Sequence, residues 1–504
     1  MADDLFSYFR SRFPEDMEKV FLETSDGRII TYGNLLTETG RLANLLMSLG
    51  LAPGDRLAVQ AEKSADALLL YLATLRAGAV YLPLNPAYTA SEVRYFLTDA
   101  APRAFIHDPA NESALSALAT ELGIAHRLTL GPDSSGTLMA AAMKHGSDFT
   151  DIARNADDLA AILYTSGTTG RSKGAMLTHA NLRSNADVLC SFWRFTAEDV
   201  LLHALPIFHT HGLFVGTNVT LAAGASMLFL PRFELGDVIR LLPRASVMMG
   251  VPTFYTRLLG APAFTRDLVA HMRLFVSGSA PLLSQTHTEF TERTGHAILE
   301  RYGMTETNMN TSNPYDGARI PGSVGPALPG VEVRIANPET GKPIRGDVGV
   351  IEVRGPNVFG GYWNMPERTA EEFRADGFFI TGDLGHIDER GYVYIIGRAK
   401  DLIISGGLNV YPVEVEDAIN ALPGVTESAV IGVPHPDFGE AVVAVVKLNA
   451  GAGMTESQMN SQLAERLAGF KRPKRVLFTD ELPRNTMGKV QKKALRDLHA
   501  RLFS

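Results

Sequence analysis

The sequence predicts an α/β protein with a large N-terminal domain of αβ-layered sheets plus a β subdomain, and a small mobile α+β C-terminal domain. The chain has 504 residues, which is too many for one hydrophobic core of ordinary size. In its first half, short apolar runs alternate with amphipathic stretches, as in parallel sheets covered by helices. The pattern then changes to short strands separated by Gly and Pro, and a new αβ pattern follows in the tail.

The alternating part begins with a strand at 56–60, a helix at 65–78 that ends on a glycine, and a second strand at 79–84. The same rhythm recurs further along, and we expect strands at 200–205, 226–230, 247–250 and 274–277. Strands separated by helices predict parallel pairing, with helices on the faces of the sheet.

The second half predicts the β subdomain and then the C-terminal domain. The expected strands of the subdomain are 331–335, 349–353 and 392–396. In the tail we expect a helix at 413–422 and strands at 428–433 and 441–448. We place the boundary at Lys400, which gives domains of residues 1–399 and 400–504.

Composition excludes several classes of function. Lys and Arg total 47 against 55 Asp and Glu, so a net charge of −8 gives no reason to expect nucleic acid as a partner. No apolar run reaches the ~18 residues of a membrane helix, and the run at 67–77, broken by Arg76, predicts a buried helix. The acidic N-terminus matches neither a signal nor a transit peptide, so we expect a cytoplasmic protein without membrane contact. The single cysteine, Cys190, fits a reducing compartment and predicts a packed core thiol, not a nucleophile.

A glycine-rich loop at 164–174 follows an apolar strand at 159–163 and reads Tyr-Thr-Ser-Gly-Thr-Thr-Gly-Arg-Ser-Lys-Gly. Its glycines let backbone N–H groups turn inward as an anion nest, and its hydroxyls and lysine add donors and positive charge. This combination suits a polyphosphate, although the spacing is not that of a Walker A loop. Taken alone, the segment is also compatible with a solvent-exposed turn.

Four further motifs follow this loop: Arg-Tyr-Gly-Met-Thr-Glu at 301–306, Thr-Gly-Asp at 381–383, Gly-Arg-Ala-Lys-Asp at 397–401, and the segment 483–489. With these motifs in this order over residues 159–493, the chain resembles the adenylate-forming superfamily. That superfamily includes acyl-CoA synthetases, firefly luciferase and the adenylation domains of peptide synthetases. Ser172 departs from the proline that is common before the loop lysine. The resemblance implies ATP and CoA as co-substrates, Mg²⁺ as cofactor, and an acyl-adenylate intermediate.

The resemblance also assigns roles to single residues. Lys489 matches the lysine that bridges the acid's carboxylate and the α-phosphate, although alone it is also compatible with a solvated lysine of a basic tail. Glu306 and Thr165 match the positions that hold Mg²⁺. Asp383, which is otherwise explained as a turn-capping residue, and Arg398 match ribose contacts. The other implied ATP or AMP contacts are Ser166, Gly167, Thr168, Thr169, Gly170, Lys173, Ser279, Ala280, Glu300, Arg301, Tyr302 (against adenine), Gly303, Met304 and Thr305.

For the second half-reaction the family swings its C-terminal domain about a hinge, which here matches Lys400. Ser405, Gly406 and Gly407 would then enter the site and leave room for the pantetheine arm of CoA.

The acid is expected to be a short dicarboxylate. Arg301 stands where many relatives have a small residue, and a buried guanidinium there needs an anion to pair with. Ser279, His209 and His211 lie nearby in the family's geometry. We therefore expect malonate, with methylmalonate tolerated, and the whole chain is also similar to malonyl-CoA synthetases. In the alternative, Arg301 pairs with a protein acid such as Glu300 and turns away from the pocket.

The sequence is also compatible with other functions. The chain could be a different short- or medium-chain acyl-CoA synthetase, or an adenylating enzyme that loads a carrier protein. A nucleotide-binding regulator without catalysis is disfavoured by the joint presence of Lys489, Glu306, Thr165 and Asp383. A lysine acetyltransferase acting on Lys489 would be an off-switch, because acetylation removes the charge.

Overall fold

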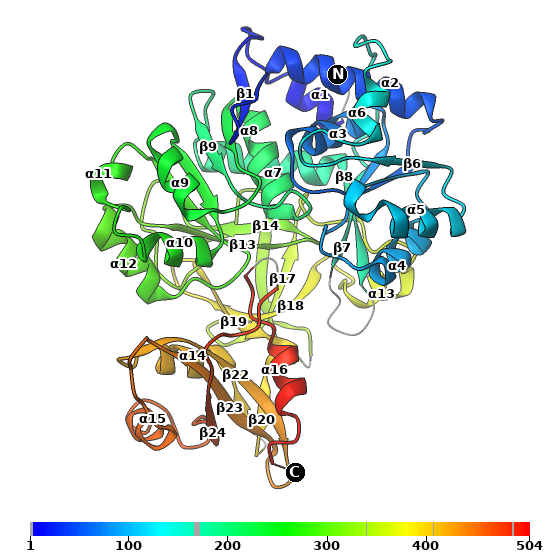
Figure 1. Cartoon of the computed structure of the whole chain (residues 1–504). Coiled ribbons are helices and arrows are strands. Elements are labelled where there is room, and N and C mark those ends of the chain that lie inside the picture. The colour runs from blue at the N-terminus through cyan, green and yellow to red at the C-terminus, as the bar shows by residue number, and fades with distance from the viewer. Residues whose placement is uncertain (1–3, 166–171, 339, 407, 486–487, 504) are drawn as a thin grey trace.

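The computed structural model describes residues 4–165, 172–338, 340–406, 408–485 and 488–503. Figure 1 shows a large upper body and a smaller lobe below it, which begins after β19 and contains the C-terminus. This mixed α/β architecture, with a large N-terminal and a small C-terminal part, is the predicted fold class. The boundary at Lys400 itself stays a prediction.

The first large sheet has six strands in the order β6-β5-β3-β4-β7-β8. All neighbours pair in parallel except β7 and β8. The strands are β3 (Arg56–Gln60), β4 (Val80–Pro83), β5 (Ala104–His107), β6 (His126–Thr129), β7 (Leu159–Thr165) and β8 (Lys173–Thr178). Helix α3 (Ala65–Arg76) is buried along its whole length because its residues are apolar on nearly every side. The predicted strand–helix–strand unit is confirmed.

The second large sheet has eight strands in the order β14-β13-β12-β11-β9-β10-β1-β2. Its strands are β1 (Val20–Thr24), β2 (Ile29–Thr31), β9 (Val200–His203), β10 (Ser226–Phe229), β11 (Val247–Gly250), β12 (Leu274–Ser277), β13 (Leu299–Met304) and β14 (Asn308–Ser312). Pairing is parallel from β13 to β1 and antiparallel at both edges. The four strands expected between 200 and 277 are all present.

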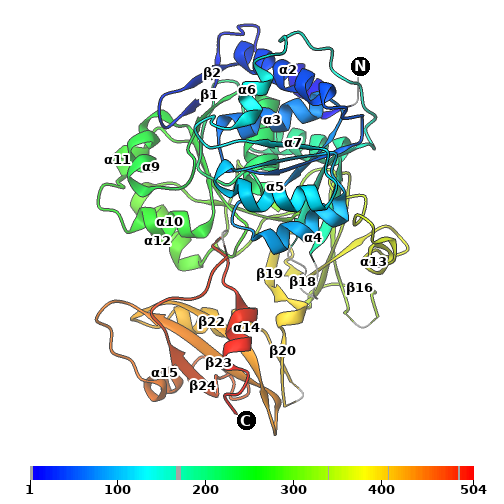
Figure 2. The same cartoon turned by 45° about the vertical axis from the view of Figure 1, so that its right-hand side comes forward.

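Helices cover these two sheets, and the largest hydrophobic core lies beneath α1, α2, α3, α7 and α8. Figure 2 shows α4 and α5 on the outer side of the six-stranded sheet. The helices of the body are α1 (Leu5–Arg10), α2 (Tyr32–Ser48), α4 (Ala90–Ala100), α5 (Glu112–Glu121), α6 (Thr137–Ala142), α7 (His179–Phe192), α8 (Asn218–Ala223), α9 (Leu235–Leu241), α10 (Pro252–Leu259), α11 (Arg266–Val269) and α12 (Ser284–Thr294). Shorter turns are the 3₁₀ helices η1 (Pro109–Asn111) and η3 (Leu242–Arg244) and the π-helix η2 (His211–Thr217).

The β subdomain is an antiparallel sheet in the order β16-β15-β17-β18-β19, with helix α13 (Pro366–Glu371) beside it. Its strands are β15 (Glu332–Ala336), β16 (Pro343–Ile344), β17 (Gly349–Arg354), β18 (Phe379–Ile387) and β19 (Val393–Arg398). The interpretation of Thr-Gly-Asp as a turn that Asp383 caps is wrong. These residues belong to β18, where Asp383 pairs with Arg398 of β19.

The smaller lobe has its own sheet and two small hydrophobic cores. Its strands are β20 (Ile403–Ser405), β21 (Leu408–Val410), β22 (Val425–His435), β23 (Gly439–Leu448) and β24 (Arg475–Phe478). Its helices are α14 (Pro412–Asn420), α15 (Glu456–Leu463) and α16 (Lys492–His499), and the 3₁₀ helix η4 (Ala399–Asp401) leads into it. The α+β character expected of the tail is confirmed.

The structure bears on two expectations from composition: the lack of a membrane helix and the state of the single cysteine. Within the described part of the chain, we find no helix with both the length and the apolar character to cross a bilayer. Cys190 lies on α7, partly buried against the main core, and its burial raises the pKa of the thiol to about 11. A thiol in this state is mostly protonated and packs as a small apolar group, as expected.

Candidate active site

The sequence-predicted residues gather where several strands of both large sheets end. Thr165 is the last residue of β7, Ser279 follows the end of β12 by two residues, and Arg301 lies on β13. Ligands of open α/β sheets bind beyond the carboxyl ends of their strands, so this edge is where a substrate is expected.

The phosphate end of the site is described only in part. Thr165 pairs with Lys173 across β7 and β8. Ser166, Gly167, Thr168, Thr169 and Gly170 lie outside the described residues, so their predicted phosphate contacts stay predictions. The Nζ of Lys173 lies 2.8 Å from Oε1 of Glu372 and 4.0 Å from the ring centre of Tyr362.

Glu306 belongs to the same cluster. It is buried, and burial raises the pKa of its carboxyl group. The hydroxyl of Tyr362 lies 3.0 Å from Oε1 of Glu306 and 2.6 Å from Oε2 of Glu372, so it connects the expected metal ligand with the partner of Lys173. Sequence reasoning missed Tyr362 and Glu372, since no spacing around Gly-Gly-Tyr-Trp or at the end of α13 indicates a contact with the phosphate loop.

The nucleotide end is built by β13, β18 and β19. The hydroxyl of Tyr302 donates to Oδ2 of Asp383, whose Oδ1 lies 2.6 Å from Nε of Arg398. The ring of Tyr302 is buried in the core of the β subdomain, so its predicted place against adenine stays a prediction. Position 303 requires glycine, because the backbone of Asn308 comes so close that a Cβ at 303 would lie 1.8 Å from its carbonyl oxygen. Met304 and Thr305 follow, both half-buried.

Glu300 does not pair with Arg301. Successive residues of a strand point to opposite faces, and Oε1 of Glu300 accepts a bond from the backbone N–H of Gly322 at 3.4 Å. Burial raises the pKa of Glu300 to about 8. No ion pair joins these two side chains in the structure, which describes both of them in full. The alternative in which Arg301 turns away to Glu300 is therefore wrong.

Arg301 is buried with unsatisfied donors. The residue is 4% exposed, and neither Nε nor Nη2 has a hydrogen-bond partner within the described part of the chain. The guanidinium lies flat against Gly278, where a Cβ would be 2.3 Å from its Cζ. Burial lowers the pKa of Arg301 to about 9, which still leaves it charged at neutral pH. A buried cation without an acceptor indicates that an anion binds here.

Two histidines stand beside this guanidinium. Burial lowers the pKa of His209 to about 4, and burial also holds the pKa of His211 well below its usual range; the charge of Arg301 adds to both effects. Both rings are therefore neutral at physiological pH. Nδ1 of His211 lies 3.2 Å from Oγ of Ser279, which has a left-handed backbone (φ 71°) and precedes the half-buried Ala280.

Unpaired polar atoms lie on Arg301 and on its neighbour His211. Besides the two nitrogens of Arg301, Nε2 of His211 is buried without a partner among the described residues, and the charge of Arg301 acts on this ring. Oγ of Ser277 is also unpaired, but Ser277 is the strand partner of Glu300 and shares the face of the sheet to which Glu300 points. Buried polar groups nearly always have a partner, so the free atoms of Arg301 and His211 predict a polar ligand. The structure thus brings together Arg301, His211 and Ser279, as the sequence predicted, and adds Gly278.

The C-terminal tail reaches this site. A Cβ on Gly488 would lie 3.1 Å from Oγ1 of Thr253, at the start of α10, so the loop before Lys489 touches the body. Lys489 lies at the mouth of the site: the residue as a whole is exposed, but its amine is near enough to Arg398 and Asp383 for their charges to act on it. Partial burial of the amine and the charge of Arg398 together lower its pKa.

The residues predicted for CoA lie elsewhere. Ser405 is buried at the end of β20, and the N–H of Gly406 donates to the carbonyl of Phe438 at 2.9 Å. Figure 1 shows β20 in the smaller lobe and β13 in the upper body, and Figure 2 also shows β20 in the smaller lobe. Gly407 lies outside the described residues. In this arrangement Ser405 and Gly406 do not meet the acid pocket, and their role stays a prediction.

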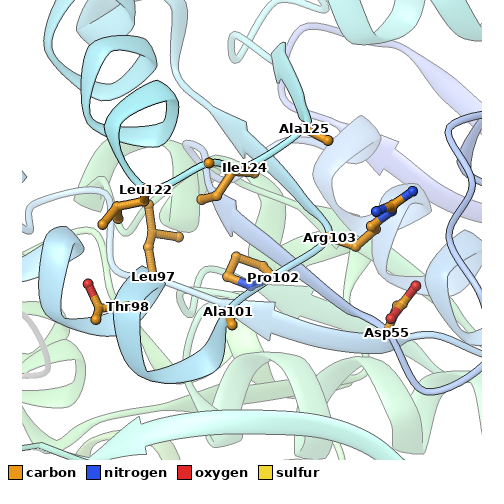
Figure 3. Close-up of a pocket in the computed structure, with 10 residues that line it drawn as sticks. Asp55, Leu97, Thr98, Ala101, Pro102, Arg103, Leu122, Ile124 and Ala125 are labelled. Carbon is orange, nitrogen blue, oxygen red and sulfur yellow. The ribbon is translucent and has the colours of Figure 1, made fainter.

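Surface hollows also lie away from Arg301, and the described residues line at least the following ones. One, of about 360 Å³, opens at the outer edge of the six-stranded sheet between α4 and α5, and none of the site residues lines it (Figure 3). The other, of about 620 Å³, borders the Lys173 cluster and is lined by Met176, Phe359, Tyr362 and Phe373 with their neighbours.

Comparison with known proteins decides the family. Residues 9–363 match the family model of the AMP-binding enzymes, and residues 414–489 match that of the AMP-binding enzyme C-terminal domain. The chain belongs to the AMP-binding enzymes. This family membership confirms the predicted superfamily and makes the chain an AMP-forming acid–thiol ligase.

Individual relatives span nearly the full chain. A malonate–CoA ligase of Arabidopsis thaliana is 32% identical over 98% of this chain and 89% of its own. A feruloyl-CoA synthase of Amycolatopsis is 37% identical over 93% and 94%. MatB of Rhodopseudomonas palustris is 60% identical over the whole of both chains, with a TM-score of 0.98 for its ATP-bound crystal structure. Its apo crystal structure gives a TM-score of 0.86, so the present arrangement corresponds more closely to the ATP-bound form.

Proposed function

We propose that this AMP-binding enzyme joins malonate to coenzyme A through an acyl-adenylate and releases AMP and pyrophosphate. The observation that carries the choice of acid is the buried guanidinium of Arg301, whose Nε and Nη2 have no hydrogen-bond partner among the described residues. The similarity to malonate–CoA ligases over nearly the whole chain supports it.

In the first half-reaction, a carboxylate oxygen of the acid attacks the α-phosphorus of ATP, and the bond to pyrophosphate breaks. The two reactants are anions, so the enzyme must hold them together and neutralise their charge. Lys489 supplies a positive charge at the mouth of the site, and the Asp383–Arg398 pair is placed to hold the ribose. The pair also fixes Tyr302 through its hydroxyl.

Mg²⁺ fits the phosphate end of this scheme. Glu306 and Thr165 offer a carboxylate and a hydroxyl oxygen, which are the hard ligands that Mg²⁺ prefers, and phosphate oxygens and waters complete such a shell. The ion supplies charge neutralisation at the phosphates when bound. Tyr362 orients the Glu306 carboxylate from the protein side.

The acid is oriented by its second carboxylate. Malonate has two carboxylates separated by one methylene group, so one can reach the α-phosphate while the other meets Arg301. A planar guanidinium pairs with a carboxylate through two parallel hydrogen bonds. The neutral His211 adds a hydrogen bond without adding charge. A methyl branch, as in methylmalonate, leaves both carboxylates in place.

In the second half-reaction, the CoA thiol attacks the acyl carbon, its proton is lost to solvent, and AMP leaves. Lys489 occupies the mouth of the site in the present arrangement, so it has to withdraw first. Rotation about Lys400 would remove it and bring Ser405, Gly406 and Gly407 toward the acyl group.

The test is thioester formation by purified protein with ATP, Mg²⁺ and CoA across malonate, methylmalonate, succinate, acetate and octanoate. We expect activity on malonate, with methylmalonate second. Activity centred on acetate or octanoate would keep the ligase and reject the acid assignment. Adenylation without thioester on any acid would favour loading of a carrier protein.

Two regulatory and cellular expectations complete the proposal. We place the enzyme in the cytoplasm, with small molecules as its substrates. Lys489 is an exposed residue, and its acetylation by a lysine acetyltransferase would stop adenylation by removing the charge. Mass spectrometry of the cellular protein tests this, and an always unmodified Lys489 would argue against it.

A further inference from the structure

A lysine is buried between the two large sheets without a carboxylate to pair with. Lys63 follows β3 and is 7% exposed, and burial holds its pKa well below the usual range. Its Nζ lies 2.8 Å from the carbonyl oxygen of His203, 2.9 Å from Nδ1 of the same histidine, and 4.2 Å from the ring centre of Phe229. Burial of an amine is costly, so this one requires a structural or functional reason.

The contacts on the two sides of the ring determine the tautomer of His203. The carbonyl oxygen of Gly212 lies 2.9 Å from Nε2 and can only accept, so the single hydrogen of the neutral ring is on Nε2. Nδ1 is then an acceptor, and the nitrogen of Lys63 donates to it and to the carbonyl oxygen of His203. Burial and the charge of Lys63 both keep His203 neutral, because they hold its pKa well below the usual range.

The hydrogen on Nε2 has one clear acceptor. Nε2 of His203 lies 2.9 Å from the carbonyl oxygen of Gly212, in the first turn of the π-helix η2. The hydroxyl of Thr217 donates to the same oxygen at 3.2 Å. A Cβ on Gly216 would lie 3.0 Å from this Nε2, so the imidazole packs directly on the helix.

This turn carries a residue of the acid pocket. His211 is the first residue of η2 and precedes Gly212, so the carbonyl that His203 holds is one peptide away from it. π-Helical turns are rare and need support, and they occur frequently at functional sites. The support here comes from side chains on two sheets: Lys63 at the carboxyl end of β3 and His203 at the carboxyl end of β9.

We propose that Lys63 is a positioning residue for the acid: it fixes the tautomer of His203, which anchors the first turn of η2 and so orients His211. Lys63 and His203 themselves touch no substrate. The inference rests on the proposed function, because it concerns binding of the same acid in the same pocket.

The first experiment replaces Lys63 by Met, which has similar length and no ammonium group. Loss of the anchoring bond should raise KM for the acid roughly tenfold or more, with KM for ATP changed less than about twofold. Lys63→Arg keeps a cation with N–H donors and should recover part of the acid affinity. Tyr32→Phe is the matched control, because it removes another buried hydrogen bond, to the carbonyl of Ala225, and should leave both KM values unchanged.

A second pair of variants tests the tautomer directly and does not depend on Lys63→Met folding. The amide nitrogen of Gln can replace Nε2 of histidine, whereas the shorter Asn reaches only the position of Nδ1. His203→Gln should therefore keep the bond to Gly212 and a nearly normal KM for the acid. His203→Asn should lose both and resemble Lys63→Met.

Three outcomes would overturn the inference. The first is a folded Lys63→Met with an unchanged KM for the acid, and the second is an equal rise of KM for the acid and for ATP in that variant. The third is an equal rise of KM for the acid in His203→Gln and His203→Asn. The measurements use the acid that the wild type turns over best. If that acid is not malonate, the proposed function fails while the ratio between variants still tests the role of Lys63.

Discussion

Arg301 is the single residue on which the choice of acid depends. Arg301→Leu removes both free guanidinium nitrogens from the pocket while keeping its apolar contacts. We expect KM for malonate to rise roughly a hundredfold, because two charge-assisted hydrogen bonds are lost, and ATP binding to change less than about threefold. Steady-state kinetics and ATP titration separate the two quantities. Arg301→Lys, which keeps a charge without the planar fork, should be intermediate, and equal losses for both substrates would contradict the assignment.

Glu300, on the other face of the same strand, should make stability depend on pH. Its pKa is about 8 in the folded protein, well above that of an exposed glutamate, so the folded state binds more protons between these values. Below the pKa of the unfolded state, Glu300 is protonated in both states and stability does not depend on it. As pH rises from there toward 8, the unfolded chain loses this proton first, so the free energy of unfolding falls. The free energy of unfolding of Glu300→Gln relative to wild type should therefore rise between pH 5 and pH 9. Glu289→Gln, at an exposed position, is the control, and an unchanged difference would rule the effect out.

The sequence predicted the site residues that belong to motifs, but not those whose role depends only on contacts made in the folded chain. Arg301, Asp383 and Lys489 stand at recognisable spacings. Tyr362 and Glu372 act on a loop lysine about two hundred positions away, and only the folded chain brings them there. The role of Lys63 could not be predicted for the same reason, since its partner His203 belongs to another sheet.

At the scale of elements, the turn after β12 determines whether Arg301 can reach the pocket. Gly278 has no room for a Cβ beside the guanidinium, so Gly278→Ala should displace Arg301. We expect KM for malonate to rise about tenfold or more, with ATP binding nearly unchanged, if one charge-assisted hydrogen bond is lost. Gly236→Ala on α9, where the added methyl meets nothing within 4 Å, is the matched control. Unaltered malonate kinetics in Gly278→Ala would mean that the close approach is not needed for binding.

The regular elements followed from hydrophobic pattern, and the irregular ones did not. Strands β3, β11 and β12 have the predicted bounds because they are short, apolar and buried on both faces. Strand β18 was missed because Thr-Gly-Asp, with Gly382 at φ 71°, has the composition of a turn. The π-helix η2 has no sequence signature of this kind, and side chains of other elements support it.

At the scale of the whole molecule, the two half-reactions should respond differently to a stiffer connection. Proline fixes φ and removes a backbone N–H, so Lys400→Pro should restrict rotation of the C-terminal lobe. Adenylation, measured by pyrophosphate release, should stay within about threefold of wild type, while thioester formation should fall at least about tenfold. Lys400→Ala, which removes only the side chain, should spare both. Equal slowing of the two steps would reject Lys400 as the hinge.

The arrangement of the two lobes places Lys489, and not the predicted CoA loop, at the site. The close match to an ATP-bound relative agrees with the loop before Lys489 touching Thr253. The predicted CoA loop remains in the smaller lobe, where Ile404 and Leu408 on either side of it are 53% and 48% exposed. For this loop to contact CoA at the site, as we propose, the lobes must adopt a second arrangement, and hydrophobic pattern and motif spacing carry no information on such a movement.

The lone cysteine makes that second arrangement accessible to spectroscopy. With a pKa of about 11, the thiol of Cys190 is ionised in roughly one molecule in ten thousand at pH 7, and it is partly buried on α7. Thiol-reactive dyes should therefore pass over it and label cysteines introduced on the surface of each lobe. The native chain should therefore add almost no unwanted labelling to a two-dye distance measurement, which can follow movement of the two lobes during turnover.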